Sequence, residues 1–224
     1  GGMNVVRYGS MRNNILALEI VLSSGEILSL GSNLIKDNTG YNLKDIFCGS
    51  EGTLGVITKA RIKIYPKPID YLTCFISMNS IENVMDIFKY VSRNFTDKIE
   101  RIEFISDLSF ELCLKHKLLN KRFFQKKTKY YLLIKFIYFN DSKTNLENIE
   151  KFFTSQENNC EEFLLAQNEK ESIDFWRFRE SLTEAQKIDG KLLGFDISIP
   201  INNMEIFLLK SKQKIEKLVP NIKF

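Results

Sequence analysis

The chain has 224 residues, and because 44% of them are hydrophobic and 12% aromatic, it is long and apolar enough to bury the cores of two globular units. Lys and Arg outnumber Asp and Glu by 32 to 28, and this excess is spread along the chain, so the charge alone does not indicate a nucleic-acid or anionic-lipid partner. No apolar run approaches the about 20 residues of a membrane-spanning helix, and the amino terminus lacks a signal-peptide pattern.

The first third of the chain is predicted to contain a β-hairpin and a further strand. Apolar runs at 15–22 and 26–30 flank a Ser-Ser-Gly turn, which is typical of a hairpin. Residues 58–64 alternate between uncharged and basic side chains, which predicts a strand with one buried and one solvent-exposed face. Pro66 and Pro68 then end the strand.

The remainder alternates short apolar runs with helical patterns, as in a sheet layered against helices, so we predict an α+β fold. We place the domain boundary at the proline pair, between a first domain at 1–68 and a second at 69–224. Ser80 is expected to cap a helix that presents one apolar face, made of Ile81, Val84, Phe88 and Val91. The other predicted elements are strands at 71–77, 100–105, 130–138, 161–166 and 192–199, and helices at 143–154, 169–188 and 202–217.

The segment 49–58 has a glycine at every third position up to Gly55 and runs directly into the alternating strand. Glycine backbones adopt positive φ and approach a flat or anionic ligand closely, so the segment is a candidate binding loop. The alternative is a tight turn or β-bulge, which is the commoner use of glycine in strand sequence. The pattern matches neither a Walker loop nor a dinucleotide fingerprint.

The predicted helix at 169–188 offers a second candidate site. At helical spacing Trp176, Arg179 and Thr183 share a face that is distinct from the apolar one, made of Phe175, Phe178, Leu182 and Ala185. A guanidinium and a hydroxyl one turn apart suit a small carboxylate beside an aromatic wall. The alternative is a surface arginine that pairs with Glu180 or Glu184.

Three other features are predicted to carry no chemistry. The basic run at 121–129 is interpreted as a solvated loop rather than a nucleic-acid patch. His116, the only histidine, lies between two lysines and is expected to be solvated, so no Ser-His-Asp or Cys-His arrangement is available. The four cysteines are far apart and form no Cys-x-x-Cys pair, so no metal site is predicted, and reduced thiols in a cytoplasmic protein fit best.

Several motifs in order resemble the FAD-linked oxidases of the vanillyl-alcohol-oxidase (PCMH-type) superfamily, within the branch of D-lactate, D-2-hydroxyglutarate and glycolate dehydrogenases. The resemblance covers nearly the whole chain, although 69–165 matches by the order of its elements and by scattered residues. The motifs are Gly1-Gly2, Val6 to Arg12, Lys36 to Lys44, Gly49 to Thr58, Trp176 to Gln186 and Asp196 to Pro200.

The resemblance implies the second half of a PCMH-type FAD-binding domain at 1–68, followed by a ferredoxin-like α+β substrate domain at 69–224. It implies that Arg179 and Thr183 bind the carboxylate of the hydroxyacid. It also implies that FAD is bound, mostly by backbone, along residues Gly1, Gly2, Glu51, Gly52, Thr53, Leu54, Gly55, Val56 and Ile57. In such enzymes the α-carbon of a 2-hydroxyacid transfers hydride to the flavin. The reduced flavin is then reoxidised by a quinone, a cytochrome or an electron-transfer flavoprotein.

Three departures lead us to expect an interior fragment without a catalytic residue of its own. The family's pyrophosphate loop precedes the region matched here, and its proposed base lies beyond Phe224. Gly194 stands where many members have a substrate-binding lysine, with Lys191 as a candidate replacement. The alternative function is a non-catalytic assembly partner. A homodimer or a companion chain with the remaining segments is expected, in the cytoplasm or peripheral at the inner membrane.

Overall fold

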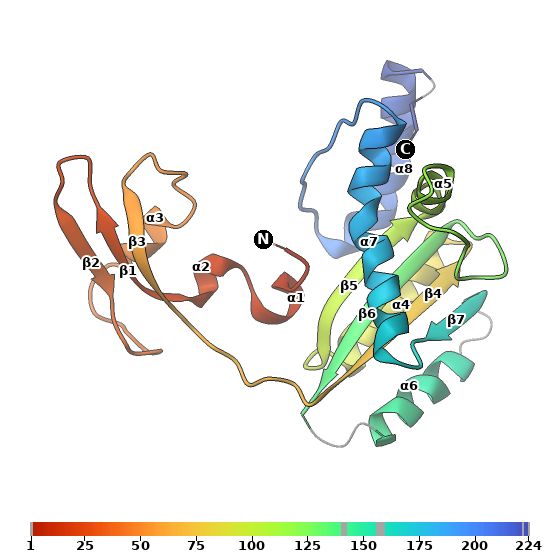
Figure 1. The fold of residues 1–224 in the computed structure, drawn as a ribbon, viewed down its shortest axis with the longest axis horizontal. Helices are drawn as coiled ribbons and strands as arrows, with labels where there is room; N and C mark the ends of the chain where they lie inside the picture. The colour runs from red at the N-terminus through yellow and green to blue at the C-terminus, as the bar shows by residue number, and fades with distance from the viewer. Residues whose placement is uncertain (1, 140–142, 156–159, 221, 224) are drawn as a thin grey trace. The chain divides into compact units, whose positions relative to one another are not determined.

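The computed structural model describes residues 2–139, 143–155, 160–220 and 222–223, and the side chains of 143–146 and 154 are not described. The chain divides into two compact units, Gly1–Pro68 and Ile69–Phe224 (Figure 1).

The first unit is built on a three-stranded antiparallel sheet with the order β2-β1-β3. Its small core consists of Ile15, Leu18, Ile20 and Cys48. The predicted hairpin is confirmed, since β1 pairs with β2 and the Leu22 N–H donates to the Glu26 carbonyl across the turn. In chain order the elements are α1 (Val5–Tyr8), α2 (Met11–Asn14), β1 (Ile15–Val21), β2 (Ile27–Gly31), α3 (Lys44–Phe47) and β3 (Val56–Ile62).

The prediction of one buried face on the strand at 58–64 is wrong. The strand forms as β3, but every one of its residues is exposed, including Val56 at 64% and Ile62 at 48%. Strand alternation shows which side chains point to the same face, but burial also requires an element that covers that face. Within the described residues nothing buries either face of β3, and its hydrogen-bonded neighbour is β1 alone.

The second unit holds a four-stranded antiparallel sheet with the order β5-β6-β4-β7. Two strand-helix-strand segments, β4-α4-β5 and β6-α6-β7, interleave in this sheet as in a ferredoxin-like fold, so the predicted α+β class is confirmed. The elements are β4 (Asp70–Met78), α4 (Ile81–Asn94), β5 (Ile99–Ser106), α5 (Asp107–Lys115), β6 (Tyr130–Tyr138), α6 (Lys143–Ser155), β7 (Glu162–Leu165), α7 (Glu169–Asp189), the 3-10 turn η1 (Ile201–Asn203) and α8 (Met204–Leu218).

Each face of this sheet is covered by different helices, with α7 on one side and α4 on the other (Figure 1). Even-numbered residues of β4 and β6 pack against α4 and α6 in one core. On the opposite face, Phe75 and Tyr131 meet Phe110 of α5 and Phe178 of α7. As predicted, Ser80 caps α4, and its Oγ accepts a 3.1 Å hydrogen bond from the Asn83 N–H. Helix α7 packs against α5 and β4 on this face.

In the second unit, one predicted strand is wrong and one helix was not predicted. The expected strand at 192–199 does not form, and four of its five apolar side chains are exposed, from 42% at Leu192 to 79% at Phe195. An apolar run becomes a strand only when a neighbouring strand accepts its backbone hydrogen bonds, and none of the described strands does. Helix α5 was not predicted, because it follows β5 without a loop and its nine residues are too few for a clear periodicity.

Candidate active site

Arg179 and Thr183 lie on the same side of α7 and line one cavity of about 680 Å³, a volume typical of small-molecule sites. The helix begins at the Asn168 cap, whose side chain accepts from the Glu171 N–H at 3.0 Å. Phe175, Phe178 and Ala185 are buried and fix the rotation of α7 about its axis. The predicted spacing therefore brings the guanidinium and the hydroxyl into one pocket, where Glu103, Ser106, Lys129 and Tyr130 also contribute to the wall.

The Arg179 side chain is held at one of its edges. Its Nε donates a 2.8 Å hydrogen bond to Glu103 Oε2, and only 29% of the Arg179 side chain and 18% of the Glu103 side chain are exposed. Neither the Nη atoms of Arg179 nor the hydroxyl of Thr183 bonds to another described residue. The alternative partners considered above, Glu180 and Glu184, do not pair with Arg179. The free edge of the guanidinium is therefore available to an anion.

The predicted aromatic wall is not formed by Trp176. Its ring is 7% exposed and belongs to a neighbouring cavity, where the Arg101 guanidinium lies 5.2 Å from the ring centroid. Its Nε1 lies 3.4 Å from Thr73 Oγ1 on β4. The cavity beside Arg179 is instead lined by Phe104 and Tyr130, whose ring centroids are 5.6 Å apart. Trp176 is buried against the sheet together with Phe175 and Phe178, so the buried face of α7 is wider than the one predicted from helical spacing.

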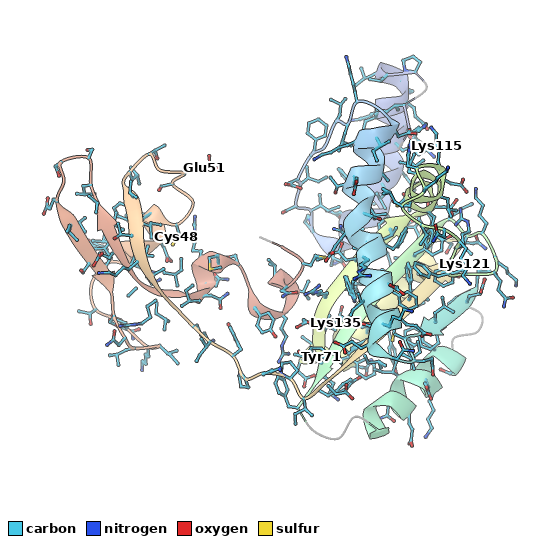
Figure 2. The ribbon with its side chains drawn as sticks, in the orientation of Figure 1. Cys48, Glu51, Tyr71, Lys115, Lys121 and Lys135 are labelled. Carbon is cyan, nitrogen blue, oxygen red and sulfur yellow. The ribbon has the colours of Figure 1, made fainter. Side chains whose placement is uncertain are left out.

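The glycine-rich segment forms a turn between α3 and β3, and Figure 2 shows Glu51 on it. Gly49, Glu51 and Gly52 have positive φ values of 88°, 51° and 78°. The Thr53 N–H and hydroxyl both donate to the Ser50 carbonyl, at 3.0 and 2.7 Å. Glu51 and Gly52 are exposed residues, and their N–H groups bond to no other described residue. These unpaired backbone donors fit the edge of a flavin or another planar acceptor.

Gly55 has a separate structural reason for lacking a side chain. A Cβ at this position would lie 2.8 Å from the Val21 carbonyl oxygen and 2.9 Å from Ile20 Cγ2 on β1. Val56 and Ile57 follow as exposed residues of β3. Packing against β1 is therefore sufficient to explain why a glycine occupies position 55, whether or not a cofactor lies nearby.

Gly55→Ala is expected to destabilise the first unit by about 1 to 3 kcal/mol, the usual cost of overpacking, because the clash is with backbone that cannot rotate away. Hydrogen exchange of the β1 and β3 amides measures this cost directly. Glu26→Ala, at an exposed position in the hairpin turn, is the control and should change exchange little. Equal protection in Gly55→Ala and the unmodified chain would contradict the packing argument.

Other residues that the sequence singled out are not brought to the α7 cavity. Gly1 lies outside the described residues, and Gly2, with φ of 110°, accepts from the Val5 N–H through its carbonyl at 3.3 Å. Lys191 and Gly194 lie in the exposed stretch that replaces the predicted strand, and an added Cβ on Gly194 would meet no atom within 4 Å. Neither residue lines the cavity beside Arg179.

The prediction that His116 is solvated is wrong. Its side chain is 15% exposed, and its Nε2 lies 3.0 Å from Asp189 Oδ1 at the end of α7. Lys115 and Lys223 also bond to the Asp189 carboxylate. These hydrogen bonds, with Lys115 and Lys223 contributing most, lower the pKa of Asp189 well below its usual range. The cluster ties α5, α7 and the end of the chain together.

Asp189→Asn is expected to destabilise the second unit at pH 7 and to do so less at pH 3. A lowered carboxylate pKa contributes stability that is fully present above the unfolded pKa of about 4. This contribution decreases gradually as the pH falls from there through the lower pKa of the folded state, so part of it is lost at pH 3. Urea midpoints at the two pH values, followed by the fluorescence of the single tryptophan, measure the difference. Asp174→Asn, which removes one partner of an exposed pair with Arg177, is the control. An Asp189→Asn deficit that is equal at both pH values would rule out this linkage.

The segment 121–129 is more ordered than the predicted solvated loop. Arg122 donates to Asp107 Oδ1 at 2.7 Å and to Glu111 Oε1 at 2.6 Å, and Lys127 also bonds to Glu111 at 2.8 Å. Phe124, only 4% exposed, packs against the core. Two of its five basic side chains are therefore paired with acids of α5, which leaves less positive charge for a nucleic acid than the sequence indicated.

The described parts of the chain contain four free cysteines and no cluster of three or more His, Cys, Asp or Glu side chains arranged to hold a metal ion. Among the same residues, no helix is both long and apolar enough to span a bilayer.

Comparison with known proteins identifies similar sequences and folds. A family model described as "FAD linked oxidases, C-terminal domain" matches residues 67–222. The mitochondrial D-2-hydroxyglutarate dehydrogenase of Arabidopsis thaliana is 31% identical over 206 residues, covering 91% of this chain and 37% of that protein. The corresponding Bos taurus enzyme is 32% identical over 209 residues, with the same coverage of 91% and 37%. The chain thus spans little more than a third of these relatives.

Among solved structures, an alkyldihydroxyacetonephosphate synthase superposes with a TM-score of 0.67 at 19% identity, over 98% of this chain and 44% of that one. At this identity the similarity concerns the fold alone.

Proposed function

Because this chain belongs to the FAD-linked oxidases and contains their C-terminal domain, we propose that its protein oxidises a D-2-hydroxyacid to the 2-oxoacid with FAD as cofactor. The names of the relatives favour D-2-hydroxyglutarate over lactate or glycolate. The observation that carries the proposal is the pocket on α7, where an arginine with a free guanidinium edge and an unpaired threonine hydroxyl lie one turn apart.

In this proposal Arg179 and Thr183 bind and orient the substrate carboxylate. The two Nη atoms of Arg179 form a planar pair of donors that matches the two oxygens of a carboxylate. The Thr183 hydroxyl, one helical turn further on, can donate to the same carboxylate. Phe104 and Tyr130 provide apolar walls that exclude water and strengthen these contacts.

We also propose that residues 1–68 belong to the FAD-binding domain, with the turn at 51–57 alongside the cofactor. The supporting observation is that Glu51 and Gly52 are exposed residues whose N–H groups bond to no other described residue. FAD, when bound, supplies the acceptor for the hydride from the α-carbon of the hydroxyacid. A quinone, cytochrome or electron-transfer flavoprotein is the proposed final acceptor.

The proposal is tested with the complete protein that carries this chain, purified with its flavin. Under anaerobic conditions, D-2-hydroxyglutarate is expected to bleach the visible flavin absorption, and D-lactate and glycolate are expected to do so more slowly. The L-enantiomer of 2-hydroxyglutarate is the matched control. If no D-2-hydroxyacid reduces the flavin, the proposed reaction is wrong; if D-lactate is fastest, only the substrate assignment is wrong.

A further inference from the structure

We propose that Glu103 is a positioning residue, which holds the Arg179 guanidinium in the one orientation that presents its Nη edge to the substrate carboxylate. This inference rests on the proposed function, since it assigns a role within the same pocket. The contact that carries it joins β5 to α7 across 76 residues of sequence, between Glu103 Oε2 and Arg179 Nε at 2.8 Å.

Glu103 is placed by the rigid part of the fold. It lies in β5 opposite Leu133 of β6, on the same side of the sheet as Arg101 and Ile105, and α7 covers that side. Its side chain is 18% exposed, and its one hydrogen-bond partner among the described residues is Arg179. A charged group this poorly hydrated needs a partner, so the pair is expected to persist in solution.

The choice of nitrogen atom determines what Glu103 does. A glutamate that took both Nη atoms would occupy the edge that a substrate needs. Because Glu103 accepts only from Nε, it restricts rotation of the planar guanidinium about the last side-chain bonds of Arg179. Both Nη donors remain available to a ligand. A ligand then loses less side-chain entropy when it binds.

Without Glu103, the Arg179 side chain could turn away from the cavity. The freed side chain would regain its rotamer freedom, which a ligand would then have to restrict when it binds. The loss of Glu103 should therefore weaken substrate capture more than the step that follows it. If the pair with Arg179 were purely structural, loss of Glu103 would instead lower the stability of the second unit and leave the affinity for the substrate unchanged.

The first measurement needs no substrate. In the 224-residue chain, the Arg179 Nε–H is expected to give a slowly exchanging NMR signal, assigned by its loss in Arg179→Lys. Glu103→Ala should increase this exchange at least tenfold, whereas Glu103→Gln, whose amide oxygen can still accept from Nε, should retain most of the protection. Glu180→Ala is the matched control and should leave the signal unchanged. An exchange rate that is the same in Glu103→Ala would overturn the proposal.

The second measurement uses the complete enzyme with D-2-hydroxyglutarate. Glu103→Ala should raise KM on the order of tenfold with a smaller change in kcat, and Glu103→Gln should recover most of the loss. Tryptophan fluorescence on urea unfolding identifies a variant that fails to fold, in which case the Gln variant decides the question. An unchanged KM in Glu103→Ala, when Arg179→Ala does raise KM, refutes positioning alone. If neither variant changes KM, the carboxylate site itself is wrong, and Glu103 forms only a structural pair.

Discussion

Phe75→Ala is expected to destabilise the second unit by about 3 to 5 kcal/mol, the range for removing a large aromatic side chain from a packed core. Phe75 is fully buried at the centre of β4. Its ring lies 4.9 Å from that of Phe124 and 5.4 Å from that of Phe175, and it also contacts α5 through Phe110. Three separate segments meet on this one side chain, so they cannot all collapse into the space that it leaves.

The effect is measured by urea unfolding with Trp176 as the probe. This is the only tryptophan of the chain, and it is buried in the same layer, so its emission reports the second unit and not the first. Phe195→Ala is the matched control, because Phe195 is 79% exposed and its removal should change stability by less than about 0.5 kcal/mol. Similar unfolding midpoints for the two variants would show that Phe75 does not link these segments.

The elements of the second unit could be predicted because local patterns determine them. The alternation and length of the runs at 71–77 and 130–138 placed β4 and β6 within a residue of their bounds, and Ser80 identified the start of α4. The motifs indicated the family, which the match over 67–222 confirms. The order of strands and the role of Phe75 depend on contacts between distant segments, and periodicity carries no information about those.

The same distinction applies to the candidate site. Helical spacing brought Arg179 and Thr183 to one face of α7, and the structure places both in one cavity. Glu103 and the His116 contact with Asp189 were missed, because their partners lie 76 and 73 residues away. The available signal was a glutamate within the strand sequence Ile-Glu-Arg-Ile-Glu-Phe-Ile at 99–105, because a charge that becomes partly buried requires a partner. The sequence does not reveal which basic side chain is the partner of this glutamate.

Arg179→Ala in the complete enzyme is expected to weaken binding of the hydroxyacid by about 1.5 to 3 kcal/mol, the range for a hydrogen bond to a charged group. This corresponds to a fall in kcat/KM of about 10-fold to 150-fold. The reason is the loss of both Nη donors, which Thr183 alone cannot replace. Steady-state kinetics with D-2-hydroxyglutarate, compared with an uncharged 2-hydroxy ester, measure the part of the loss that depends on the carboxylate.

Arg177→Ala provides the control, because Arg177 lies on the same helix, is 74% exposed and pairs only loosely with Asp174 at 3.9 Å. It removes the same charge from α7 without removing a donor from the cavity, so it should leave kcat/KM within a factor of about two. Equal losses in the two variants would mean that the general positive charge of the helix attracts the acid. A loss confined to Arg179, and absent with the ester, would assign the carboxylate contact to the guanidinium edge that Glu103 leaves free.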